Sequence, residues 1–170
     1  MKIDNFIRDI PDFPNPGIIF KDITPLLANH SALVSCADQL AALSPKGVNI
    51  DKVIGVESRG FIIGGMIAER LGAGFVPVRK KGKLPYKVKS KNYSLEYGED
   101  TLEIHIDAIQ PGEHVLIHDD VLATGGTAKA VCDLVVELGG VVVQCNFIMK
   151  LDFLSGKDKL NAPISSLLTY

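Results

Sequence analysis

Short runs of apolar residues alternate with segments whose apolar residues recur at helical spacing. Four of the apolar runs have the length of buried strands. In two longer segments, apolar residues recur every three or four positions, and each segment ends at a glycine. The predicted strands are residues 53–56, 75–78, 115–117 and 141–149, and the predicted helices are residues 61–71 and 128–138. Gly72 and the pair Gly139-Gly140 follow the two helices, as expected for helix C-termini.

A different pattern separates the second and third predicted strands. Residues 84–92 are polar and rich in lysine with no periodicity, so we expect a long loop there. The stretch "YSLEYGEDTLEIHI" then alternates with period two on both sides of residues 98–100. This alternation predicts a β-hairpin.

Strands that alternate with helices predict the fold class. We expect an α/β domain with a mostly parallel, twisted sheet that is flanked by helices on both faces. The chain has 170 residues, of which 46% are hydrophobic, which is enough for one proper core. No repeat or linker divides it, so residues 1–170 are expected to form a single domain.

Three unusual loops each follow a predicted strand at its carboxyl end. They are "ESRG" at 57–60, "RKKGK" at 79–83 and "HDDVLATGGT" at 118–127. Ligands of open α/β sheets bind outside the carboxyl ends of the strands. The three loops should therefore meet in one site.

The third loop combines two acids with an anion-binding turn. Thr124, Gly125, Gly126 and Thr127 lead into a helix, so their amides and hydroxyls can surround a phosphate at the positive end of the helix dipole. Asp119 and Asp120 would repel a phosphate but accept hydrogen bonds from sugar hydroxyls. Together they predict a ribose 5-phosphate site, although a capped turn or a Mg²⁺ site remains open.

Charge and cysteine content limit the partners and the compartment. The formal net charge is −2, so the chain offers no global attraction to nucleic acid or an anionic membrane. No apolar run approaches the roughly 18 residues of a membrane span. Cys36, Cys132 and Cys145 are odd in number and widely spaced, which is typical of reduced thiols. We expect a cytoplasmic protein.

The motifs also resemble those of a known family. "VLIHDDVLATGGTAKA" is similar to the phosphoribosyl pyrophosphate signature of the type I phosphoribosyltransferases. "IPDFPNPGIIFKDI", "ESRGF", "VRKKGKLP" and "YSLEYG" follow in the order found in the members that use adenine. The resemblance extends from about Pro11 to the C-terminal "SLLTY". It implies a purine salvage enzyme that transfers the 5-phosphoribosyl group from phosphoribosyl pyrophosphate to adenine, giving AMP and pyrophosphate.

The resemblance assigns roles to both ends of the phosphoribosyl group. Asp119 and Asp120 would hold the ribose hydroxyls. The loop around the 5-phosphate would be Ala123, Thr124, Gly125, Gly126 and Thr127. The residues near pyrophosphate would be Ser58, Arg59, Arg79, Lys80 and Lys83. The Ser58–Arg59 peptide is commonly cis in the family, and some basic loop residues reach the neighbouring subunit, which implies a homodimer.

The base site would lie under an N-terminal hood of about residues 1–30. Ile18, Ile19 and Phe20 would enclose the purine, the backbone of Ile19 would read its edge, and Arg59 would lie near the same pocket. Lys21 stands where relatives often have arginine, which removes the bidentate geometry of a guanidinium but keeps the charge.

The resemblance also implies a mechanism. Glu96 would manage the proton of the purine and Tyr97 would pack over the reacting sugar, under a flexible lid of about residues 82–105. Mg²⁺ would be carried mainly by the pyrophosphate rather than by a protein metal site. Two alternatives remain: a transferase for hypoxanthine, guanine or xanthine, and a non-catalytic regulator that senses phosphoribosyl pyrophosphate on the same fold.

Overall fold

The computed structural model describes residues 1–94 and 98–170 of the chain. Its strands are β1 (Arg8–Pro11), β2 (Ile19–Asp22), β3 (Lys52–Val56), β4 (Gly74–Lys80), β5 (Val88–Ser94), β6 (Glu99–His105), β7 (His114–Leu122), β8 (Val141–Lys150) and β9 (Ile164–Thr169). Its α-helices are α1 (Thr24–Ala28), α2 (His30–Ala42), α3 (Glu57–Leu71) and α4 (Gly126–Glu137). Short 3-10 helices are η1 (Ile3–Phe6), η2 (Asp152–Leu154) and η3 (Gly156–Lys159).

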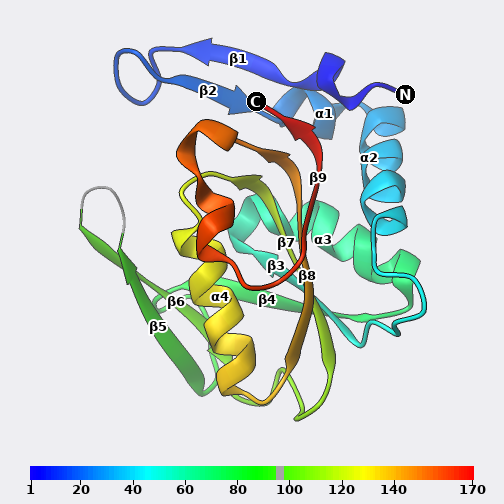
Figure 1. The fold of residues 1–170 in the computed structure, drawn as a ribbon, viewed down its shortest axis with the longest axis vertical. Helices are drawn as coiled ribbons and strands as arrows, with labels where there is room; N and C mark the ends of the chain where they lie inside the picture. Colours follow the sequence, from blue (N-terminus) through cyan, green and yellow to red (C-terminus); the bar gives the residue numbers. More distant parts are fainter. Residues whose placement is uncertain (95–97) are drawn as a thin grey trace.

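The main sheet is mostly parallel. Its strands lie in the order β5-β6-β4-β3-β7-β8-β9. The pairs β4–β3, β3–β7, β7–β8 and β8–β9 are parallel, whereas β6 runs antiparallel to β4 and β5. β3 and β7 lie side by side near the middle of this sheet, so the loops after them are neighbours (Figure 1).

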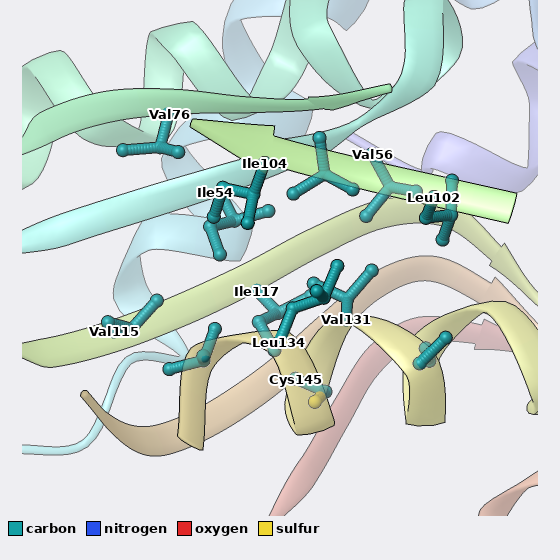
Figure 2. Close-up of a cluster of buried hydrophobic side chains, with 14 of the residues drawn as sticks. Ile54, Val56, Val76, Leu102, Ile104, Val115, Ile117, Val131, Leu134 and Cys145 are labelled. Carbon is teal, nitrogen blue, oxygen red and sulfur yellow. The ribbon is translucent and has the colours of Figure 1, made fainter. Parts of the chain in front are cut away.

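Helices cover both faces of the sheet, as predicted. α4 packs on one face, and α2 and α3 pack on the other (Figure 1). On the α4 side, the fully buried Val131 and Leu134 of the helix lie against Ile54 and Ile117 of the central strands (Figure 2). Close packing of this layer holds the first turn of α4 in a fixed position over the sheet.

The segment that was expected to be a long loop is partly a strand. β5 begins at Val88, so residues 88–92 belong to the sheet. The alternate residues Lys89 and Lys91 reach α4, where they pair with Glu137 at 3.2 and 2.7 Å. In this part of β5 the residues that alternate are charged rather than apolar, so the apolar pattern did not reveal the strand. The predicted hairpin is confirmed, because β5 and β6 pair in antiparallel fashion, but Glu99 and Asp100, which were expected in its turn, belong to β6.

The elements with no counterpart in the predicted pattern include α2 and β9. α2 begins after Asn29, whose side-chain oxygen accepts a hydrogen bond from the amide of Ala32 at 3.0 Å. β9 joins the edge of the sheet beside β8 and brings the C-terminal Tyr170 close to the N-terminal hairpin (Figure 1). Both elements depend on tertiary contacts that local periodicity does not report.

The N-terminal hairpin is a separate two-stranded sheet of β1 and β2. The Arg8 guanidinium pairs with the Asp22 carboxylate at 2.6 Å, and Thr24 also donates to that carboxylate. These hydrogen bonds, led by the Thr24 amide, lower the pKa of Asp22 to about 2. Residues 8–22 therefore have their own polar anchor to the start of α1.

None of the helices in the described ranges is both long enough and apolar enough to cross a membrane.

Candidate active site

The three loops singled out in the sequence meet at two neighbouring cavities. The first, about 290 Å³, lies between the N-terminal hairpin and the loop after β7. The second, about 200 Å³, lies between the start of α3 and the ends of β4 and β5. Arg59, Asp119 and Thr127 line both cavities. The predicted convergence at the carboxyl ends of the strands is therefore confirmed.

The loop before α4 has the geometry of an anion-binding turn. Gly125 has φ 78°, a left-handed conformation that favours glycine, and the helix begins at the next residue. Ala123, Thr124 and Thr127 also line the larger cavity. Backbone amides of the first helical turn have no partner within the helix, so they are available to a phosphate at this end.

Gly156, which no sequence pattern singled out, lies directly against the back of this loop. A Cβ atom on Gly156 would lie 2.1 Å from the carbonyl oxygen of Ala123 and 2.8 Å from the amide nitrogen of Gly125. In the opposite direction, a Cβ on Gly125 would lie 2.2 Å from the carbonyl oxygen of Gly156. The two backbones touch with no room for a side chain. The segment after β8 therefore fixes the position of the loop backbone on this side.

The two acids at the end of β7 have different surroundings. Asp119 accepts a hydrogen bond from the amide of Asp120 at 2.8 Å. Asp120 is buried, and its Oδ2 lies 3.1 Å from Arg59 Nε. Desolvation and the nearby charge of Asp120 raise the pKa of Asp119 well above its usual range. The half-exposed side chain of Arg59 lies over Asp120, and both residues line the larger cavity.

His118 is buried next to the two acids and does not line either cavity. It is fully buried, and its Nδ1 donates to Asn146 Oδ1 at 2.8 Å. Among the described residues, its Nε2 has no hydrogen-bond partner. Burial lowers the pKa of His118 to about 4, so the ring is neutral at physiological pH. This supports the interpretation that His118 is structural and not a base.

The hairpin forms the apolar end of the larger cavity. Ile18 and Ile19 are exposed on its rim, and the guanidinium of Arg59 lies 5.5 Å from the centre of the Phe20 ring. Lys21 lines the cavity, but its ammonium is 2.7 Å from Asp9 and 3.9 Å from the centre of the Tyr170 ring.

Leu151, which the sequence did not identify, completes the wall from the end of β8. It lacked a signal because its importance depends on β8 ending beside the loop after β7.

The basic residues expected near pyrophosphate separate into two groups. Ser58, Arg59 and Lys80 line the smaller cavity, and Lys80 also pairs with Asp100 at 2.8 Å. Arg79 and Lys83 do not line either cavity. Arg79 lies over the Phe61 ring and 3.7 Å from Glu57, and Lys83 is exposed.

The expected cis peptide at Ser58–Arg59 is not found. In the described parts of the chain the cis bond is Phe13–Pro14, and the backbone distortion before Ser58 is instead a left-handed φ of 49° at Glu57. The side chain of Glu57 accepts a hydrogen bond from the amide of Lys80 at 2.5 Å, which ties the turn after β3 to the end of β4. The Ser58–Arg59 peptide is trans in this turn.

Tyr93 is a second residue that the sequence did not single out. It lines the smaller cavity together with Thr127. Desolvation raises the pKa of this phenol. Glu96 and Tyr97, the expected catalytic residues, lie outside the described residues.

Comparison with known proteins identifies the class. A family model described as the phosphoribosyl transferase domain matches residues 22–165. The chain belongs to this family.

Individual relatives agree over nearly the whole chain. An adenine phosphoribosyltransferase of Flavobacterium johnsoniae is 60% identical over 171 residues, with full coverage of both chains. The crystal structure of adenine phosphoribosyltransferase from Thermoanaerobacter pseudethanolicus is 49% identical, with a TM-score of 0.95 over 99% of this chain and 98% of that one. The Saccharomyces cerevisiae enzyme, complexed with an iminoaltritol bisphosphate and adenine, is 44% identical, with a TM-score of 0.90 over 98% and 96%.

We predict that Gly156→Ala weakens binding of ribose 5-phosphate by about tenfold, because the new methyl group displaces the backbone of Ala123 and Gly125. Isothermal titration calorimetry with ribose 5-phosphate measures the effect. Gly65→Ala is the matched control, since a Cβ there has open space around it. Equal affinity in the two variants would show that the segment after β8 does not hold the loop.

The buried His118 leads to a second prediction, which concerns how stability depends on pH. Its pKa of about 4 in the folded chain lies below the ordinary 6.5, so the unfolded chain takes up a proton first as the pH falls. Stability from the neutral ring is therefore present above pH 6.5 and is lost progressively towards pH 4. This group alone should cost the wild type about 2 kcal/mol of unfolding free energy between pH 7 and pH 5.

Urea unfolding of wild type and His118→Gln at both pH values tests this. The difference in stability between them should shrink by that amount at pH 5, whereas the exposed His30→Gln control should follow the wild type. Parallel pH profiles for wild type and His118→Gln would contradict a neutral buried ring.

Proposed function

We propose that this protein transfers the 5-phosphoribosyl group of phosphoribosyl pyrophosphate to adenine, giving AMP and pyrophosphate in purine salvage. One observation carries the proposal. A single cavity has an apolar hairpin, Ile18 to Phe20, at one end and paired acids followed by an anion-binding turn at the other. A nucleoside 5'-monophosphate has the same order of parts: a flat base, a sugar with hydroxyls, and a phosphate.

The phosphoribosyl group would be held from both ends. Amides and hydroxyls of residues 123–127 would bind the 5-phosphate, where the dipole of α4 adds favourable charge. Asp119 and Asp120 would accept hydrogen bonds from the ribose hydroxyls. The raised pKa of Asp119 supports this role, because hydroxyl donors stabilise a carboxylate that is otherwise poorly solvated.

Chemistry would take place between the two cavities. The bond from C1 of the ribose to a pyrophosphate oxygen breaks, the bond from C1 to N9 of adenine forms, and the N9 proton leaves. Lys80 and the amides near Ser58 border the smaller cavity and would attract the departing pyrophosphate. Glu96 would take part in moving the proton and Tyr97 would cover the sugar, as the family resemblance implies. A lid of about residues 82–105 would exclude water from the cationic C1.

The acid pair also fits a Mg²⁺ ion that enters with the substrate. Asp119 and Asp120 offer hard carboxylate oxygens of the kind that Mg²⁺ prefers; Asp119 lines both cavities, and Asp120 lines the larger one. When bound, Mg²⁺ would neutralise charge on the pyrophosphate. Most of its ligands would come from pyrophosphate and water.

Base selection would rely on the backbone of the hairpin. β2 pairs with β1 along one edge, and alternate residues of β2 direct their amides and carbonyls away from β1. We infer that the amide of Ile19 donates to N1 of adenine while a nearby carbonyl accepts from the 6-amino group. Hypoxanthine, guanine or xanthine would present the opposite polarity at this edge.

The assembly and location that we propose are a homodimer in the cytoplasm. Lys83 is exposed and does not line either cavity of its own subunit, as expected if it serves the neighbouring subunit. The three cysteines are free, which is compatible with a reducing compartment.

We predict that the enzyme prefers adenine to hypoxanthine by about a hundredfold or more in kcat/KM, because two buried polar groups would lose their partners with hypoxanthine. Ile19→Val should keep the preference, since it keeps the amide. Ile19→Pro should lose much of it, along with activity, because proline has no N–H. Pyrophosphate release with a panel of purine bases measures these values. Comparable efficiency with both bases would favour the alternative transferase.

We also predict that Asp119→Asn or Asp120→Asn lowers kcat/KM for phosphoribosyl pyrophosphate by about ten- to a hundredfold, since each carboxylate would lose a charge-assisted hydrogen bond to the ribose. Steady-state kinetics measure the loss. Asp107→Asn, an exposed acid outside both cavities, serves as the control and should behave as wild type. Wild-type kinetics in both test variants would refute the ribose assignment.

A further inference from the structure

Two thiols lie in contact on the side of α4 that faces the sheet. The Sγ atoms of Cys132 on α4 and Cys145 on β8 are 3.6 Å apart. Figure 2 shows Cys145 among the buried side chains under α4, in the same layer as Leu134 and Ile117. Neither cysteine belongs to the cavities of the active site.

The two thiols differ in access to solvent. Cys145 is fully buried, whereas Cys132 is partly exposed and lines a separate cavity of about 310 Å³. Lys129 and Asp133 of α4 and Asn161 of the segment before β9 also line this cavity. A small polar oxidant can therefore reach Cys132 but not Cys145.

The electrostatic surroundings agree with this division. A hydrogen bond from the neighbouring Cys145 lowers the pKa of Cys132; burial and the Asp133 carboxylate oppose this shift, and the Lys129 ammonium adds to it. The contact with Cys132 and burial raise the pKa of Cys145. Because the thiolate is the nucleophile, Cys132 is the thiol that reacts first.

We propose that Cys132 and Cys145 form a peroxide-sensitive dithiol that controls phosphate binding through α4. The Cys132 thiolate attacks hydrogen peroxide, the O–O bond breaks, and the products are a Cys132 sulfenic acid and hydroxide. The Cys145 sulfur then attacks the Cys132 sulfur. A disulfide forms, the S–O bond breaks, and the hydroxyl group leaves as water with the Cys145 proton. Two thiols are oxidised and one peroxide is reduced to two molecules of water.

Oxidation would affect the active site because α4 begins at the loop that would bind the phosphate. Gly126 is the first residue of α4 and belongs to the loop at the phosphate end, and Cys132 lies less than two turns further along the helix. A disulfide needs an S–S distance of about 2.05 Å, so the two sulfurs must approach by about 1.5 Å. Val131 and Leu134 are fully buried on either side, and the close-packed helix moves as a unit. The loop would move with it.

The experiment compares reduced and peroxide-treated protein. Peptide mapping by mass spectrometry under non-reducing conditions should find a Cys132–Cys145 disulfide that dithiothreitol removes. Calorimetry with ribose 5-phosphate should show affinity about tenfold weaker in the oxidised wild type, restored by dithiothreitol. Circular dichroism should show that the oxidised protein stays folded.

Variants separate this site from general oxidation. Cys132→Ser should form no disulfide and keep its affinity after peroxide, and Cys132→Ala provides the same test if the serine variant folds poorly. Cys36→Ser is the control, because Cys36 is buried in the other core cluster and should leave the wild-type response unchanged. The proposal is overturned if no Cys132–Cys145 disulfide is mapped, if the disulfide leaves affinity unchanged, or if Cys132→Ser and Cys132→Ala lose affinity as the wild type does.

Discussion

The carboxyl end of β7 holds two neighbouring acids directly before a turn that is suited to an anion, and the site depends on this electrostatic conflict. Asp119 and Asp120 would repel a phosphate placed beside them, so the phosphate has to lie at the loop while a neutral, hydroxyl-bearing group separates the charges. Arg59 covers Asp120 and Asp119 has a raised pKa, which are both consequences of two acids in a poorly solvated position. The acids and the loop line the same cavity, which supports the proposal that a sugar lies between them and the phosphate.

The rest of the structure keeps that spacing fixed. β7 lies between β3 and β8 in the sheet, α4 is packed on the core below the loop, and the backbone of Gly156 touches the loop from behind. The N-terminal hairpin is anchored separately, through Arg8 and Asp22, and through Lys21 against Tyr170. The polar half of the site is thus built into the sheet, whereas the apolar half is carried by an element that is joined to it at a few points.

The parts of this arrangement that depend on local sequence could be predicted. The strands β3, β4, β7 and β8, the helices α3 and α4, and the meeting of the three loops all follow from short periodic patterns and from the geometry of parallel sheets. The order of acids and glycines from Asp119 to Thr127 also predicted a ribose 5-phosphate site, and that assignment stays a prediction.

What the sequence did not reveal depends on contacts between distant segments. Gly156 and Leu151 matter because β8 ends beside the loop after β7, and no local pattern reports that. Residues 88–92 of β5 were expected to lie in a loop, because the partners of Lys89 and Lys91 lie on α4. Arg79 was expected near pyrophosphate from its position after β4, but its side chain lies on Phe61 instead. The position of a residue at a strand end predicts that it lies near the site, whereas side-chain packing determines whether its side chain lines the site.

A crystal structure with AMP bound tests the account most directly. We expect the phosphate to contact residues 123–127, the ribose hydroxyls to lie within hydrogen-bonding distance of Asp119 and Asp120 with Arg59 displaced, and the purine to lie against Ile18 to Phe20. A ribose whose hydroxyls are directed away from both acids, or a phosphate bound elsewhere than in the loop before α4, would contradict it.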